Sequence, residues 1–102
     1  MPLNAPTDTN TPDAWWVYVL LCQREKLYVG IAKDVEVRFK LHCAGRGAFF
    51  TRLNKPIQVL AQERHPSRSS ALKAEYALKQ RKREEKLAWV QETGPGTRPA
   101  GN

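Results

Sequence analysis

The chain has 102 residues, of which 17 are lysine or arginine and 10 are aspartate or glutamate, giving a formal net charge of +7. This length allows one small domain, and the longest apolar run, WWVYVLLC at 15–22, is too short to cross a bilayer. No membrane partner is therefore expected. The positive charge favours a polyanion such as nucleic acid as partner, although a merely soluble basic protein is the alternative.

The two ends of the sequence differ from its middle. Residues 1–13 and 93–102 are rich in Pro, Thr, Asn and Gly, so we expect two disordered tails around one domain at 14–92. The start does not resemble a signal peptide, which predicts a cytoplasmic location. Cys22 and Cys43 lack the spacing of a zinc site or a disulfide framework, so neither is expected.

The first half of the domain predicts a β-hairpin followed by a helix. Aromatic and β-branched residues at 15–22 and an apolar run at 27–31 predict two strands. The polar residues between them contain no Gly or Asn, which leaves the turn type open. Asp34 is a good N-cap for a helix at 35–44, and the sequence Gly-Arg-Gly at 45–47 ends that helix.

The second half predicts a loop, a strand and two helices, at 48–56, 57–63, 71–83 and 87–90. Ser69 or Ser70 is expected to cap the first of these helices. The two helices are either separate or continuous. The resulting order, β-β-α-β-α-α, predicts an α+β domain with a small antiparallel sheet.

A few polar residues stand out against this pattern. Glu75 lies in the middle of the apolar arc of its helix, where an unpaired charge is costly. It either pairs with a lysine or arginine, which the helical period alone favours, or binds a divalent cation in a cleft. Arg38 and His42 share one helix face at i, i+4, which suits either solvent or a phosphate.

The tyrosines and the basic loop leave further alternatives open. Tyr18 and Tyr28 point to the same face of the hairpin only if its loop has an odd number of residues. Phe49 and Phe50 are either buried under their loop or free to stack on bases. Three cations around them are candidate nucleic-acid contacts: Arg46, Arg52 and Lys55.

The order and spacing of these elements are informative together. The chain carries, in order, WVY at 16–18, YVG at 28–30, Arg38 ten positions after the second tyrosine, and Glu75 on a later helix. This combination resembles the GIY-YIG nuclease domain, and most of all its small stand-alone bacterial members of unassigned role. The resemblance covers roughly 15–90 and implies a GIY-YIG fold, with a three-stranded antiparallel sheet flanked by helices. Trp16 stands where the motif name has Gly, as is usual in this branch.

The resemblance also implies catalytic roles. Tyr18 would activate the attacking water, directly or through a neighbour, and Tyr28 would hydrogen-bond in the same cluster. Arg38 would bind the scissile phosphate, with His42 as an auxiliary proton-transfer or phosphate-contacting group. Glu75 would be the sole carboxylate that anchors one Mg²⁺ or Mn²⁺ ion. A further position, Gly30, would let the chain turn so that backbone and substrate approach closely.

The function implied by the resemblance is metal-dependent hydrolysis of phosphodiester bonds, with DNA favoured over RNA as substrate. No small-molecule cofactor is implied. No appended DNA-binding module is expected, and binding should therefore be weak and salt-sensitive, with little sequence specificity. The alternative is a non-catalytic nucleic-acid-binding module that keeps the GIY-YIG fold.

Overall fold

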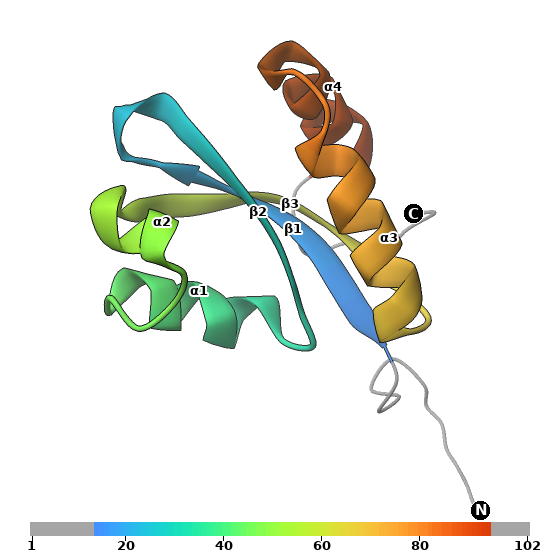
Figure 1. Cartoon of the computed structure of the whole chain (residues 1–102), viewed down its shortest axis with the longest axis horizontal. Coiled ribbons are helices and arrows are strands. Elements are labelled where there is room, and N and C mark those ends of the chain that lie inside the picture. The colour runs from blue at the N-terminus through green and yellow to red at the C-terminus, as the bar shows by residue number, and fades with distance from the viewer. Residues whose placement is uncertain (1–13, 95–102) are drawn as a thin grey trace, which may run out of the picture.

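Three strands form one antiparallel sheet in the computed structural model, which describes residues 14–94 of the chain. They are β1 (Trp15–Cys22), β2 (Lys26–Ala32) and β3 (Pro56–His65), arranged in the order β2-β1-β3 (Figure 1). The predicted α+β class and its three-stranded sheet are therefore confirmed. The predicted tail at 1–13, and the predicted C-terminal tail beyond residue 94, lie outside the described residues.

The hairpin between β1 and β2 turns through three residues, η3 (Gln23–Glu25). Because this number is odd, Tyr18 and Tyr28 lie on the same face: Tyr18 pairs with Gly30, and Leu20 pairs with Tyr28. The loop therefore has the odd number of residues that the sequence left open, and this number sets the relative position of the two tyrosines.

The turn itself has an unusual backbone for its sequence. Arg24 and Glu25 have φ of 62° and 59°, in the left-handed region where Gly and Asn are usual. The Arg24 guanidinium donates to the Leu53 carbonyl at 2.6 Å and to Asn54 Oδ1 at 2.8 Å. These tertiary bonds offset the local strain, which explains why the turn residues did not reveal its type.

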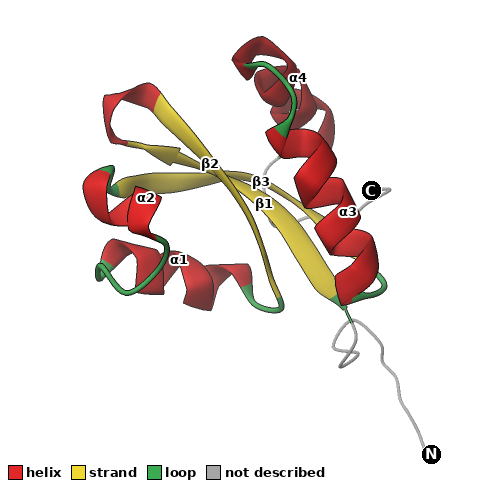
Figure 2. Cartoon of the chain, viewed as in Figure 1, coloured by secondary structure: helices red, strands yellow, loops and turns green. Residues whose placement is uncertain are grey.

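Within the described part of the chain, four α-helices accompany the sheet (Figure 2): α1 (Val35–Cys43), α2 (Phe49–Leu53), α3 (Arg68–Lys79) and α4 (Arg83–Thr93). Asp34 caps α1 as predicted, since its Oδ1 accepts from the Val37 N–H at 3.2 Å. The segment predicted as a loop contains α2, which at five residues is too short to show a helical period. No helix within residues 14–94 has the length and apolar character needed to span a membrane.

The later helices differ from the prediction at their ends. Helix α3 begins at Arg68, so its cap is Ser67, whose Oγ accepts from the Ser70 N–H at 3.1 Å; the choice of Ser69 or Ser70 was wrong. The helix ends at Lys79, earlier than predicted. The chain then breaks over 80–82, and α3 and α4 are separate helices.

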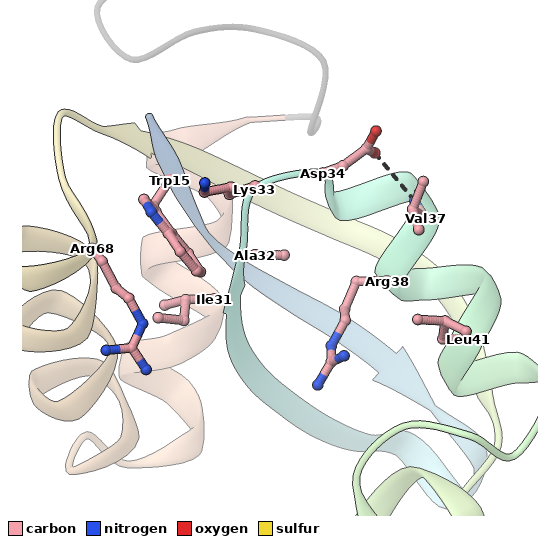
Figure 3. Close-up of a pocket in the computed structure, with 9 residues that line it drawn as sticks. All are labelled: Trp15, Ile31, Ala32, Lys33, Asp34, Val37, Arg38, Leu41 and Arg68. Carbon is pink, nitrogen blue, oxygen red and sulfur yellow. Dashed lines mark hydrogen bonds between the residues drawn. The ribbon is translucent and has the colours of Figure 1, made fainter. Parts of the chain in front are cut away.

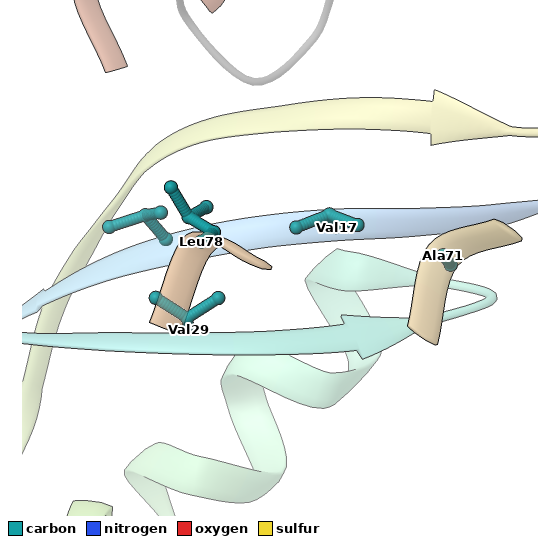
Figure 4. Packing of buried hydrophobic residues seen from close by; sticks show 5 residues of the cluster. Val17, Val29, Ala71 and Leu78 are labelled. Carbon is teal, nitrogen blue, oxygen red and sulfur yellow. The ribbon is translucent and has the colours of Figure 1, made fainter. Parts of the chain in front are cut away.

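The sheet is covered on both faces, by α3 and α4 on one side and by α1 and α2 on the other (Figure 1). The first side buries a cluster of small and branched residues (Figure 4): Val17, Val19, Val29, Ala71 and Leu78. The second side buries a cluster of Tyr18, Leu20, Cys22, Ala32 and Val35. The continuous apolar run of β1 follows from this, because both of its faces are buried.

Candidate active site

Gly30 lets the phenol of Tyr18 lie directly against β2. A Cβ at Gly30 would stand 2.6 Å from Tyr18 Oη and 2.8 Å from its Cζ, closer than side chains approach in folded proteins. The two residues are cross-strand partners, so this contact follows from the register of the hairpin. Any larger residue at this position would push the tyrosine away. The glycine therefore brings the Tyr18 hydroxyl to β2, an edge strand of the sheet.

A chain of hydrogen bonds leads inward from Tyr18. Its hydroxyl lies 3.0 Å from Nε2 of His42, which α1 supplies, and both side chains are almost fully buried. Nδ1 of His42 lies 2.8 Å from Oγ1 of Thr51, which α2 supplies and which is also buried. Three elements of the fold thus contribute one side chain each to a buried polar chain.

The direction of these bonds follows from counting donors. Thr51 has one hydroxyl hydrogen, which it donates to the Ala48 carbonyl at 2.8 Å, so Oγ1 must accept from His42 Nδ1–H. His42 Nε2 is then unprotonated and accepts the Tyr18 hydroxyl. The Ala48 N–H also donates to Nδ1, at 3.3 Å, and this bond alone would favour the other tautomer; we assign the proton to Nδ1 from the shorter bonds of Thr51. In this tautomer His42 is a base for Tyr18.

Burial dominates the proton affinities in this cluster. It raises the pKa of Tyr18, as does the nearby Tyr28, while the Arg38 guanidinium opposes the rise through its charge and hydrogen bonding. Burial also lowers the pKa of His42 below its ordinary value of 6.5, and the positive charge of Arg38 adds to this effect. At neutral pH both Tyr18 and His42 are therefore uncharged, as a proton relay at rest requires.

The lowered pKa of His42 predicts a dependence of stability on pH. Below about pH 6.5 the unfolded chain binds a proton that the folded protein does not, so the free energy of unfolding falls as pH falls towards the pKa of folded His42. Urea unfolding of the wild type and of His42→Gln across this window measures the difference in slope. An NMR titration of the His42 ring with a midpoint at or above its ordinary value would contradict the assignment.

Tyr28 packs in the same cluster through its ring. It meets His42 edge-on, with ring centroids 5.1 Å apart, and stacks on Phe50 at 5.9 Å. Its pKa is raised by burial first and by the charge of Glu75 second. Phe50 and Thr51 both come from α2, so the helix that sequence reasoning missed supplies two neighbours of the predicted catalytic residues.

Arg38 and Glu75 reach this cluster from opposite layers. Arg38 is exposed on α1 and lines a cleft of about 490 Å³ beside β2 (Figure 3). Glu75 is on α3, and its negative charge contributes to the raised pKa of both tyrosines. The two ionised side chains thus act on the same phenols, although they come from helices on different faces of the sheet.

The surroundings of Glu75 bear on metal binding. Its side chain is 17% exposed, and Oε2 lies 3.3 Å from Nζ of Lys79, the pairing that the helical period favoured. Within residues 14–94 no group of three or more His, Cys, Asp or Glu side chains is arranged to hold a metal ion. The residues therefore fit only an ion that takes one protein carboxylate and completes its shell with water and substrate oxygens, as Mg²⁺ does. Lys79, the ion-pair partner of Glu75, is half exposed.

The basic loop residues lie at the surface. Arg46, Arg52 and Lys55 are all exposed, and the Arg52 guanidinium stands 5.9 Å from the centre of the Phe49 ring. The two phenylalanines separate, because Phe49 is 67% exposed whereas Phe50 stacks on Tyr28. Phe50 is therefore packed inside its loop, and Phe49 lies at the surface.

Comparison with known proteins gives one consistent assignment. The family model of the GIY-YIG catalytic domain matches residues 14–88. A UPF0213 protein of Xanthomonas campestris pv. campestris is 47% identical over 85 residues, covering 83% of each chain. A UPF0213 protein of Staphylococcus epidermidis is 40% identical over 80 residues, covering 78% of this chain and 98% of its own. The solution NMR structure of a UPF0213 protein from Bacillus halodurans is similar with a TM-score of 0.52, at 34% identity over 79% of this chain and 86% of its own.

Proposed function

The chain belongs to the GIY-YIG family, and from this we propose that it is a divalent-metal-dependent endonuclease that hydrolyses phosphodiester bonds in DNA. The observation that carries the proposal is the buried chain from Tyr18 through His42 to Thr51, which gives a neutral tyrosine a base. A buried tyrosine with a purely structural role needs only a hydrogen-bond acceptor for its hydroxyl. It does not need an acceptor that, like His42, is also a base.

The relay would activate water as follows. Tyr18 Oη takes a proton from the attacking water as it gives its own proton to His42 Nε2. The resulting imidazolium keeps its bond from Nδ1–H to Thr51 Oγ1, which stabilises the charge. Tyr18 therefore never has to exist as a free phenolate, which its raised pKa would make costly at neutral pH.

Arg38 would bind the phosphate that is attacked. Its guanidinium is exposed to the cleft and acts on Tyr18, so a phosphate paired with it would lie next to the activated water. The fork of donors would stabilise the negative charge that develops on the phosphate oxygens in the transition state. Glu75 would hold the metal ion, and an ion there, when bound, supplies Lewis-acid stabilisation of the leaving oxygen.

The test is cleavage of single-stranded, duplex and branched DNA by the purified protein with Mg²⁺ or Mn²⁺. Glu75→Gln keeps the size of the side chain but removes its charge, so we expect at least a hundredfold lower rate, on the order of one lost electrostatic contact. Removal of the metal with EDTA is expected to abolish cleavage. Glu84→Gln, on an exposed part of α4, is the matched control and should cleave like the wild type. Equal rates for Glu75→Gln and wild type would overturn the role of Glu75.

A second candidate function is a nucleic-acid-binding module without catalysis. The observation that favours it is the exposed Phe49 ring beside the Arg52 guanidinium, a pair suited to stacking on bases next to phosphates. Salt-sensitive binding to all the DNA substrates above, with no cleavage in either metal, would favour this function over the nuclease.

A further inference from the structure

The cleft that contains Arg38 extends across β2 to a tryptophan. Figure 3 shows Trp15 and Arg68 on one side of this strand and Arg38 on the other. Trp15 comes from the start of β1 and Arg68 from the first turn of α3, so three elements distant in sequence line one cavity. Its volume of about 490 Å³ falls in the range of small-ligand sites. The proposed reaction uses only the Arg38 end of it.

The cleft is positively charged. Lys33, Arg38 and Arg68 line it, and none of the three forms an ion pair with an acidic residue in the part of the chain that the structure describes. Among residues 14–94, the only acidic one that lines it is Asp34, and its carboxylate is engaged at the N-terminus of α1. Three cations without acidic partners around one cavity favour a ligand with several negative charges.

An aromatic ring lies within this charged surface. The body of Trp15 packs against the core cluster under α3, which fixes the ring. Nζ of Lys33 and Cζ of Arg68 lie 5.7 Å and 5.6 Å from the ring centre. Both cations are long and exposed, so they can turn from the ring to a phosphate and leave an indole face to a flat ligand.

We propose that this cleft is a nucleotide-binding subsite in which one unpaired base stacks on Trp15 and the phosphates beside it lie on Lys33 and Arg68. The inference rests on the proposed function in one respect, because it takes the next phosphate along the strand to be the one on Arg38. A base inside a duplex has both faces stacked on its neighbours and cannot present one to Trp15. The preferred substrate is therefore a single strand or a single-stranded segment of a branched structure.

The test is binding in EDTA, so that cleavage does not interfere. We would measure the fluorescence anisotropy of a labelled single strand of about 12 nucleotides and of the blunt duplex of the same sequence. Trp15→Leu, which keeps an apolar side chain for packing, is expected to weaken single-strand binding about tenfold and duplex binding less than about twofold. Trp15→Phe, which restores a ring, should recover most of the loss.

Two further variants sharpen the result. Tyr76→Leu removes another exposed aromatic of α3 that is outside the cleft, and it should bind like the wild type. Lys33→Gln combined with Arg68→Gln should lower the magnitude of the slope of log affinity against log salt by about 1.4, as expected for two lost phosphate contacts on a single strand. Thermal melting followed by circular dichroism checks that each variant is folded.

The subsite and the nuclease can fail separately. Trp15→Leu binding the single strand as tightly as the wild type, or losing single strand and duplex equally, would overturn the subsite whatever the catalytic activity. Conversely, Trp15-dependent binding of the single strand without cleavage in Mg²⁺ or Mn²⁺ would overturn the nuclease and leave the subsite. An RNA strand of the same sequence that shows the same Trp15 dependence would also support the subsite, because stacking does not require a deoxyribose.

Discussion

Arg38→Ala is expected to lower the rate of DNA cleavage about a thousandfold, near the upper end of what one lost charge-stabilising group costs. The side chain is exposed and is not part of either core cluster, so we expect the free energy of unfolding to change by less than about 0.5 kcal/mol. The measurement is the single-turnover rate at saturating substrate and fixed metal concentration, with urea unfolding alongside.

The environment of Arg38 adds a second readout. Its charge helps to keep the pKa of His42 low, so removal of that charge lets this pKa rise towards its ordinary value. As the pH is lowered, any residual activity of Arg38→Ala should therefore begin to fall at a higher pH than the activity of the wild type. Arg38→Lys keeps the charge but not the fork of donors, so it should retain the wild-type pH profile at a much lower rate.

Lys40→Ala is the matched control for this prediction, because Lys40 is also an exposed cation of α1 and forms a surface ion pair with Glu36 at 3.8 Å. It should cleave at the wild-type rate. Similar losses for Lys40→Ala and Arg38→Ala would mean that Arg38 acts through general charge attraction and does not bind the scissile phosphate.

The sequence predicted those parts of the fold that are determined by residues close together in the chain. The continuous apolar run of β1 and the Asp34 cap of α1 are visible in the sequence because burial and capping act on adjacent residues. The hairpin turn was not identifiable, since Arg24 is held in its left-handed conformation by bonds to residues about thirty positions away. The pairing register of β1 and β2 could be derived only once the number of residues in their turn was known.

The same division holds for the site. Tyr18, Tyr28, Arg38, His42 and Glu75 could be named from their spacing, through the resemblance. Thr51 could not, because its partner His42 is nine positions away on another helix, and Thr51 itself lies on a helix too short for a periodic pattern. Trp15 was counted only as an apolar strand residue, and its place beside Arg68 arises from the packing of α3 on the sheet.

Gly47→Ala is expected to destabilise the protein by about 2–5 kcal/mol, the range for overpacking combined with loss of buried hydrogen bonds. A Cβ at Gly47 would stand 2.0 Å from Nδ1 of His42, 2.6 Å from Cε1 and 2.7 Å from Cγ. The imidazole is rigid and fully buried, and both of its nitrogens are bonded, to Tyr18 and to Thr51. It cannot yield without breaking the relay, so cleavage should fall together with stability.

Gly45→Asn separates this steric effect from a general need for glycine in the same loop. Gly45 has a φ of +77° and no atom within 4 Å of the position of a Cβ, so a residue that tolerates the left-handed region should cost less than about 1 kcal/mol there. Gly47 is not among the residues with positive φ, so its need for glycine comes from the neighbouring ring and not from backbone strain. Urea unfolding of the two variants gives the comparison directly. If Gly47→Ala were as stable as Gly45→Asn and cleaved DNA at the wild-type rate, His42 could not be fixed in the buried chain from which we derive the proton relay.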